Sequence, residues 1–186
     1  MKFVLILLGF SFYLISCNSN TDSKLFQKYC QSVKIIDSPF TMRCGLSQKD
    51  YEGSNQDTSL QQQLNLPVQI VGRLYPSDTN IVLLNGIPGD DLYPELLSFT
   101  RDGLPIDTLF LGGSCQGGPG NLGSSTVIIG SNKTIEKYDT VWTWVEDSMN
   151  NKVSGTGSTS VEITKYKLET SGKFSTLFTD KKYIAK

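Results

Sequence analysis

The stretch Phe99-Thr100-Arg101-Asp102-Gly103-Leu104-Pro105-Ile106-Asp107-Thr108-Leu109-Phe110 decides the fold. It joins two strand-like runs, residues 96–100 and 106–111, through Arg101-Asp102-Gly103, in which Asp-Gly favours a tight turn between antiparallel strands. A second segment, residues 168–178, repeats the order strand, glycine turn, strand and also ends in Thr-Leu-Phe. Common hairpin chemistry explains this likeness better than an internal repeat, because a true array shows three or more copies. The sequence therefore predicts a fold built from antiparallel β-hairpins.

The same pattern continues along most of the chain. Apolar runs bounded by turn residues predict strands over residues 68–75, 81–84, 96–100, 106–111, 125–130, 135–145, 161–170 and 173–178. Consecutive hairpins favour an antiparallel meander, either curled, sandwich-like or partial-propeller-like. We also expect one short N-terminal helix over residues 23–32, capped by Ser23 and with four residues on one face: Leu25, Phe26, Tyr29 and Cys30. The expected fold class is mainly β.

The N-terminus has the order basic residue, apolar segment, small residue, cysteine. Lys2 precedes an apolar segment over residues 3–15, which is shorter than the roughly 20 residues that a membrane span needs. The segment fits a signal peptide instead. The run Leu14-Ile15-Ser16-Cys17 resembles the lipobox of bacterial lipoproteins. The alternatives are an ordinary signal peptide that ends near a cysteine, or an apolar N-terminal strand.

The lipobox resemblance implies that residues 1–16 are removed and that Cys17 carries a diacylglycerol and an N-linked acyl chain. Two or more chains anchor a protein stably in a membrane, where one does not. The polar residues 17–23 predict a flexible tether, and residues 24–186 a single β-rich domain. By resemblance to the sorting rule of some two-membrane bacteria, Asn18 favours the outer membrane over the inner one. Which face of that membrane carries the protein stays open.

Residues 35–178 resemble a loose class of small bacterial outer-membrane lipoproteins. The resemblance rests on a short helix, on Cys44 near the Pro39-Phe40 turn, and on a β-meander with Asp-Gly hairpins. It implies a fold and a location and brings no activity.

Charge and composition exclude several classes of function. The 17 Lys and Arg residues nearly balance the 18 Asp and Glu residues, so the chain lacks the basic footprint that nucleic acid requires. The chain contains no histidine, which excludes Ser-His-Asp and Cys-His catalysis and the usual catalytic zinc sites. We therefore expect no enzyme activity, no metal and no cofactor.

Three cysteines remain after Cys17, so one is unpaired or joins two chains. We expect Cys30 to pair with Cys44, because closing a loop of about 15 residues stabilises a fold by roughly 3 kcal/mol. The alternative is three free, buried cysteines. Cys115 lies in a glycine-rich loop over residues 112–123, which we expect to be a mobile surface loop that could contact a partner.

Two further groups of residues are candidate sites. Asp90, Asp91 and Glu95 could act as paired carboxylates or hold calcium, but a solvated turn explains them better. Tyr138, Trp142 and Trp144 share one face of a predicted strand. These aromatic residues form either part of the core or an exposed platform for a sugar ring or a partner protein.

Three triplets read Asp, then Ser or Thr, then an apolar residue. They resemble an O-glycosylation signal of exported bacterial proteins, with Thr108, Thr140 and Ser148 as the acceptors. Strand alternation could also generate these triplets.

Together these features predict a lipid-anchored envelope protein without enzyme activity. We expect it to bind another envelope protein or to scaffold an assembly. The alternative is a lipoprotein that binds glycans through the aromatic strand.

Overall fold

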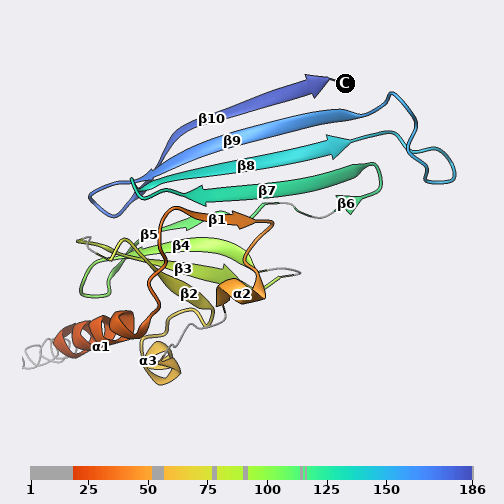
Figure 1. The fold of residues 1–186 in the computed structure, drawn as a ribbon. Helices are drawn as coiled ribbons and strands as arrows, with labels where there is room; N and C mark the ends of the chain where they lie inside the picture. The colour runs from red at the N-terminus through yellow and green to blue at the C-terminus, as the bar shows by residue number, and fades with distance from the viewer. Residues whose placement is uncertain are drawn as a thin grey trace, which may run out of the picture.

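The computed structural model describes residues 19–185, except residues 52–56, 77–78, 90–91, 114 and 116. The described chain forms two antiparallel sheets (Figure 1). The smaller sheet has the strand order β2 (Ile70–Leu74), β3 (Ile81–Ile87), β4 (Tyr93–Phe99) and β5 (Pro105–Phe110). The larger sheet has the order β1 (Phe40–Arg43), β7 (Asn121–Ile129), β8 (Thr134–Thr143), β9 (Ser158–Leu168) and β10 (Phe174–Ala185), with β6 (Gly117–Gly118) paired to β7.

This architecture confirms the prediction of a mainly β fold made of antiparallel hairpins. Both β2 to β5 and β7 to β10 are simple meanders, and neither sheet is curled or closed on itself. The two similar hairpins belong to different sheets, β4–β5 and β9–β10. Their turns share one backbone conformation, because Gly103 and Gly172 both have φ +86°, a value that favours glycine. Hairpin chemistry rather than a repeated array therefore accounts for the likeness.

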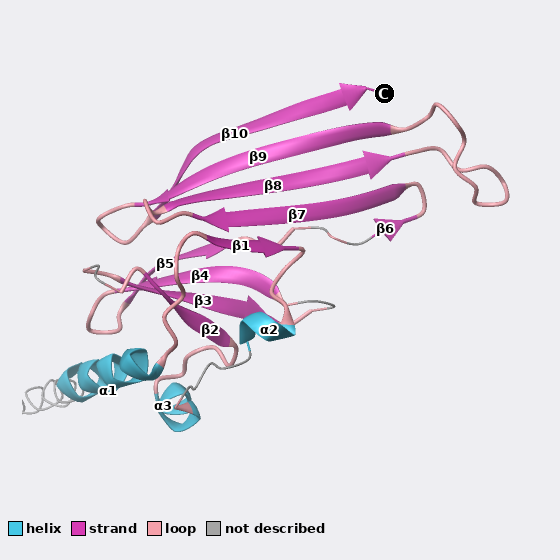
Figure 2. Cartoon of the chain, viewed as in Figure 1, coloured by secondary structure: helices cyan, strands magenta, loops and turns pink. Residues whose placement is uncertain are grey.

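Within the described ranges, three helices accompany the smaller sheet (Figure 2). They are α1 (Ser19–Ser32), α2 (Gln48–Tyr51) and α3 (Thr58–Gln63). Helix α1 confirms the predicted N-terminal helix but begins earlier, so residues 19–23 are helical rather than part of a tether. Helix α3 lies in a polar segment that includes Gln61-Gln62-Gln63. Asp57 caps it by accepting a hydrogen bond from the N–H of Leu60 at 3.1 Å.

Strand β3 is buried on both faces, as its unbroken apolar run Ile81-Val82-Leu83-Leu84 indicates. Val82 and Leu84 belong to the core between the two sheets, whereas Leu83 belongs to the core under the helices. All three side chains are fully buried. The smaller sheet is therefore the middle layer of the molecule, between the helices and the larger sheet.

The helix face predicted from the sequence packs on the smaller sheet. Phe26, Tyr29 and Cys30 of α1 are buried together with Leu60 of α3. The ring of Phe26 lies 5.2 Å from that of Phe99 in β4, a usual separation for packed aromatic rings. This second core holds α1 and α3 to the face of the sheet that points away from β7 to β10.

The core between the sheets lies at one end of the larger sheet. Its fully or nearly fully buried members on the larger sheet are Met42, Val127, Ile129, Ile135 and Leu168. The opposite end is the row where Asn121 pairs with Thr143 and Thr143 pairs with Ser158. In Figure 1 this part of the sheet extends beyond the smaller sheet. We call it the overhang, residues 121–124, 140–161 and 180–185.

Replacing Ile135 by alanine should lower the free energy of unfolding by about 2–5 kcal/mol, because it leaves a cavity between the sheets. The matched control is Leu104→Ala, whose side chain is 65% exposed. This surface change should alter stability by no more than about 0.5 kcal/mol. Urea unfolding followed by circular dichroism measures both. Equal losses in the two variants would contradict the placement of the core.

Candidate functional site

Two tryptophans line a cleft in the overhang. Register places Trp142 between Leu122 of β7 and Thr159 of β9, on one face of the sheet. The cleft has a volume of about 240 Å³, and its lining includes Trp142, Trp144, Leu122 and Lys152. Both indole side chains are half-buried, so part of each ring system is open to solvent. We call this feature the aromatic cleft.

Trp144 is held in place by hydrogen bonds from both its backbone and its ring. Its backbone N–H donates to the carbonyl of Gly120 at 2.8 Å, and its indole N–H donates to Glu146 Oε1 at 3.1 Å. The same carboxylate oxygen accepts the N–H of Gly120 at 2.7 Å. Gly120 has φ +70°, and a side chain there would meet the carbonyl of Trp144. The ring is therefore preorganised before any ligand arrives.

A cation lies against the same ring. Lys152 Nζ is 5.4 Å from the centroid of the Trp144 ring, within the range of a cation–π interaction. A β-bridge between Glu146 and Lys152 brings the lysine back to the tryptophan across the loop. The aromatic cleft thus combines apolar ring surface with one positive charge.

The loop that joins β8 to β9, residues 144–157, carries exposed apolar side chains. Val145, Met149 and Val153 are 57%, 79% and 37% exposed. Asp147 orders the loop by accepting the N–H groups of Asn151 at 2.9 Å and Met149 at 2.8 Å. These hydrogen bonds, that of Asn151 first, lower the pKa of the Asp147 carboxyl. The apolar side chains are therefore presented on an ordered loop.

Tyr138 belongs to a different structure from the two tryptophans. It shares the face of Trp142, but its O–H donates to Glu136 at 2.7 Å, and Lys165 Nζ lies 2.6 Å from the same carboxylate. The hydrogen bond from Lys165 is the main cause, and that from Tyr138 the second, of a lowered pKa for Glu136. The hydrogen bond to Glu136 raises the pKa of Tyr138. Tyr138 thus serves a polar network on the sheet and does not line the cleft.

This network predicts a pH dependence of stability. Because the pKa of Glu136 is lowered on folding, its stabilising effect is complete above the unfolded glutamate pKa of about 4.3 and is lost as the pH falls through the folded-state value. A Glu136→Gln variant should be less stable than the native protein at pH 7. Urea unfolding at a series of pH values should show this difference shrinking below about pH 4. A difference independent of pH would contradict the ionic role of Glu136.

The disulfide differs from the predicted one. Cys44 is bonded to Cys115, with their Cα atoms 5.2 Å apart, and Cys30 is free and buried. The predicted Cys30–Cys44 pair is therefore wrong. Cys30 faces the core under the helices, where burial raises its pKa to about 12, whereas Cys44 follows β1 at the edge of the larger sheet. Short sequence separation favoured a pair that the layered fold keeps apart.

The glycine-rich loop before β7 is fastened to the larger sheet. Lys137 Nζ donates to the carbonyl of Gly112 at 2.8 Å, and the N–H of Ser125 donates to Cys115 Sγ at 3.0 Å. A side chain at Gly113 would overlap Ser125 and Asp139, so only glycine fits this close approach. The expectation of a mobile loop is wrong at these positions, and Cys115 does not line the aromatic cleft.

Removing the disulfide should destabilise the protein strongly. It joins residues 71 positions apart, a separation for which the chain-entropy model gives about 4 kcal/mol. Urea unfolding of a Cys44→Ser, Cys115→Ser double variant measures the loss. A reductant should lower the unfolding midpoint of the native protein and leave that of the double variant unchanged. A native protein indifferent to reductant would contradict this role.

The remaining candidate residues that the structure describes do not come together in a second site. Asp90 and Asp91 lie outside the described residues, and Glu95 accepts a hydrogen bond from Asn85 Nδ2 at 3.0 Å. In the part of the chain that the structure describes, no three Cys, Asp or Glu side chains are grouped to hold a metal ion. Cys17 and the lipobox also lie outside the described residues.

The three glycosylation candidates lie on separate parts of the surface. Thr108 and Ser148 are exposed, and Thr140 is half-buried in β8. The aspartate before each has a structural partner: Asp107 accepts the N–H of Phe174, Asp139 pairs with Lys137, and Asp147 orders its loop. The exposed hydroxyls of Thr108 and Ser148 leave modification there as a prediction.

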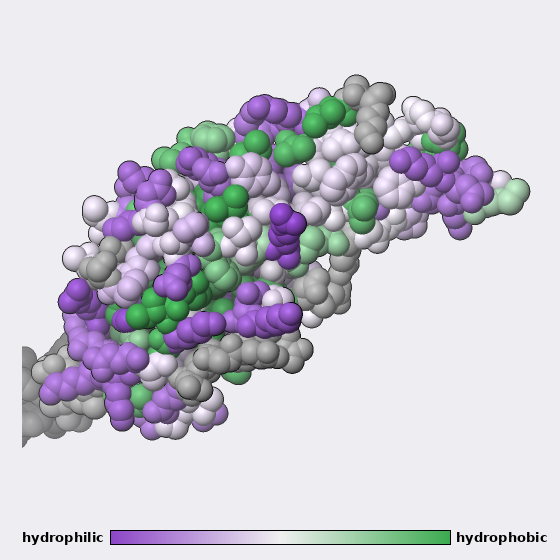
Figure 3. Space-filling model, viewed as in Figure 1, coloured by the Kyte–Doolittle hydropathy of each residue, from purple (hydrophilic) through white to green (hydrophobic). Residues whose placement is uncertain are grey.

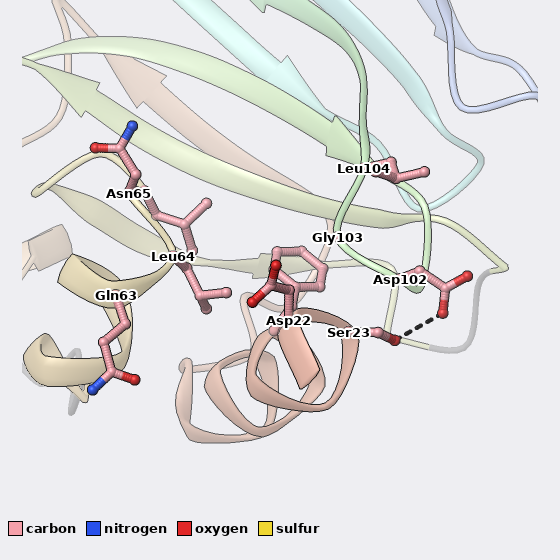
Figure 4. A pocket seen from close by; sticks show the side chains of 10 residues that line it. Asp22, Ser23, Gln63, Leu64, Asn65, Asp102, Gly103 and Leu104 are labelled. Atoms are coloured by element: carbon pink, nitrogen blue, oxygen red, sulfur yellow. Dashed lines mark hydrogen bonds between the residues drawn. The ribbon is translucent and has the colours of Figure 1, made fainter. Parts of the chain in front are cut away.

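A larger hollow of about 680 Å³ lies at the other end of the molecule (Figure 4). Residues of α1, of the segment after α3 and of the β4–β5 turn line it, and Ser23 donates to Asp102 at 2.9 Å across it. Gly103 approaches Phe26 so closely that a side chain would clash. This hollow marks the contact between helix and hairpin and contains none of the predicted site residues.

No protein-family model, curated protein or solved structure matches the chain. None of the helices within the described ranges is long and apolar enough to cross a membrane.

Proposed function

We propose that this chain is a lipid-anchored protein of the bacterial cell envelope, without enzyme activity, that binds another envelope protein through the aromatic cleft and the β8–β9 loop. One observation carries the proposal. Trp142 and Trp144 lie half-buried on the overhang, and neither belongs to the two clusters of buried hydrophobic residues that the described chain forms. Tryptophan is among the residues most enriched in the energetic centres of protein interfaces.

The neighbourhood of the cleft favours a protein partner. Val145, Met149 and Val153 are exposed on the loop that follows Trp144, so this loop offers apolar contacts of its own. Apolar side chains exposed together on one loop, among polar residues, are typical of protein interaction sites. Glu146 and Lys152 supply charges of both signs at the rim, which suits orientation of a partner more than capture of a charged small molecule.

Two features support a location in the envelope. The Cys44–Cys115 disulfide suits an oxidising compartment outside the cytoplasm, where such bonds form and persist. The lipobox-like residues up to Cys17 precede α1, and in Figure 1 α1 and the overhang lie at opposite ends of the molecule. An anchor at Cys17 would therefore leave the aromatic cleft far from the attachment point.

A glycan is the second candidate ligand. Indole rings stack well on the apolar faces of sugars. The cleft also contains hydroxyl groups, since Thr143 Oγ1 and Ser158 Oγ lie 2.7 Å apart on its lining. Its volume of about 240 Å³ would hold one or two sugar rings at most.

Crosslinking in whole cells, followed by affinity purification, tests the proposal. We expect the full-length chain to recover a specific envelope protein, and Trp144→Ala to reduce that recovery at least about tenfold, the equivalent of 1.4 kcal/mol. Phe110→Ala is the matched control, because Phe110 is an aromatic residue 53% exposed on the smaller sheet. Cys17→Ala is the unanchored control and should lose the partner.

Each outcome bears on one part of the proposal. Circular dichroism must show that the Trp144→Ala protein is folded. If it is not, Trp144→Phe, which keeps an aromatic ring, replaces it in the recovery experiment. Equal recovery from Trp144→Ala and native protein would exclude the cleft as the protein-binding site. If no protein is recovered and the purified chain binds sugars in a Trp144-dependent manner, the glycan function replaces the first.

A further inference from the structure

Strand β10 forms a long, open edge of the larger sheet. It pairs along its length with β9, and no strand of the described chain pairs with its other side. An edge strand presents unpaired backbone N–H and C=O groups that can pair with another strand. Natural edges are commonly shortened, bulged, charged or interrupted by proline. Strand β10 has 12 residues without proline or glycine, and its one irregularity in register, between Thr176 and Phe178, precedes the charged run Asp180-Lys181-Lys182.

The side chains on one face of β10 alternate in chemical type along the second half of the strand. Register with β9 places Phe178, Asp180, Lys182 and Ile184 opposite Lys165, Ile163, Val161 and Thr159, so these four share one face of the sheet. Phe178 is 49% exposed and Ile184 is 53% exposed. Figure 3 shows apolar and hydrophilic side chains following one another along the margin of the molecule over β10. Along the strand, this face reads aromatic, acidic, basic, aliphatic.

This order is self-complementary. Antiparallel pairing of two identical edges, with a two-fold axis through Lys181 and perpendicular to the sheet, keeps each residue on its own face. Phe178 then lies opposite Ile184 of the partner subunit, and Asp180 lies opposite Lys182 of the partner subunit. Symmetry repeats both contacts. Directly opposed residues in such a pair have Cα atoms about 4.5–5.5 Å apart, and both aromatic–aliphatic and opposite-charge pairs are favourable.

We propose that two copies of this chain associate through antiparallel pairing of their β10 edges, which joins the two larger sheets into one. The complementarity identifies the second occupant as another copy. A closed two-fold interface requires the same surface to match itself, as this one does. The proposal does not rest on the function proposed above, because it involves neither the aromatic cleft nor the anchor.

The contacts within one copy leave the side chains of Asp180 and Lys182 available for pairing with a second copy. Lys182 Nζ lies 3.6 Å from Asp180 Oδ2, with the two side chains 66% and 53% exposed. An exposed pair of this kind contributes little, so the partners can be exchanged across the interface. Lys181 faces the other side of the sheet, with its Nζ 5.5 Å from the centroid of the Tyr183 ring. Lys181 and its copy in the partner subunit form the pair of like charges on the axis. Each of these two ammonium groups lies near the Tyr183 ring of its own subunit.

Cysteine crosslinking of the purified full-length chain tests the register. Lys181→Cys places the new thiol on the two-fold axis, opposite its own copy, so mild oxidation should give a covalent dimer on a non-reducing gel. Thr179→Cys is the matched control. Its Cα would lie about 14 Å from its own copy along the strands, at roughly 3.4 Å per residue, so it should give at least tenfold less dimer. Equal yields from the two variants would indicate random collision and overturn the proposal.

Charge exchange in the Lys181→Cys background tests the chemistry. Asp180→Lys alone or Lys182→Asp alone places like charges opposite each other and should reduce the dimer severalfold. The double variant, Asp180→Lys with Lys182→Asp, restores complementarity and should recover the native yield. Two differently tagged single variants, when mixed, should form the heterodimer in preference to either homodimer. If the yields are indifferent to these changes, or if Lys181→Cys forms no dimer, the proposal is wrong.

Discussion

The apolar contact between the two sheets at one end of the molecule determines the rest of the structure. Ile129 and Ile135 lie opposite each other next to the turn of the β7–β8 hairpin. They belong to the same hydrophobic core as Leu84, Leu96 and Leu111. Burial of such side chains is the dominant favourable term in folding. Because this contact joins the sheets at one end only, strands of 9 to 12 residues extend past it as the overhang. The aromatic cleft and the overhanging end of β10, residues 180–185, are consequences of that asymmetry.

Within the described residues, the overhang is ordered by polar contacts and contributes no side chain to either hydrophobic core. The Cys44–Cys115 bond fastens the glycine-rich loop beside Ser125, about halfway along β7. Farther out, Glu146 joins Gly120 to Trp144, and Asp147 closes its own loop. Hydrogen bonds of this kind fix geometry with a modest net gain in stability. Such a region suits binding, because ligand-binding elements are commonly drawn from the less stable parts of a protein.

Local chemistry made the hairpins predictable from the sequence. The turns at Gly103 and Gly172 depend on a residue that tolerates positive φ, and each predicted strand has a counterpart in the structure. Longer-range features were not accessible in this way. Strand β1 pairs with β7 more than 80 residues later, and the disulfide depends on that pairing. The extension of β10 to Ala185 was also missed, because Asp180, Lys181 and Lys182 interrupt its apolar alternation.

The candidate site was predictable in part. Alternation along a strand correctly placed Tyr138 and Trp142 on one face. It could not separate Tyr138, which serves Glu136 and Lys165, from the tryptophans of the cleft, because that distinction depends on β9. Nor could it show whether the aromatic face is covered, since the reach of the smaller sheet under the larger one is a property of the whole fold.

Hydrogen exchange, compared between the purified protein and the protein in native membranes, tests most directly the claim that the overhang is a binding surface and not a core. Backbone amides near Ile129 and Ile135 should exchange slowly in both samples, because they open only with global unfolding. In native membranes, amides around Trp142, Trp144 and Thr159 should gain protection. Unchanged exchange at these positions, or protection in the purified protein equal to that at Ile135, would contradict the account.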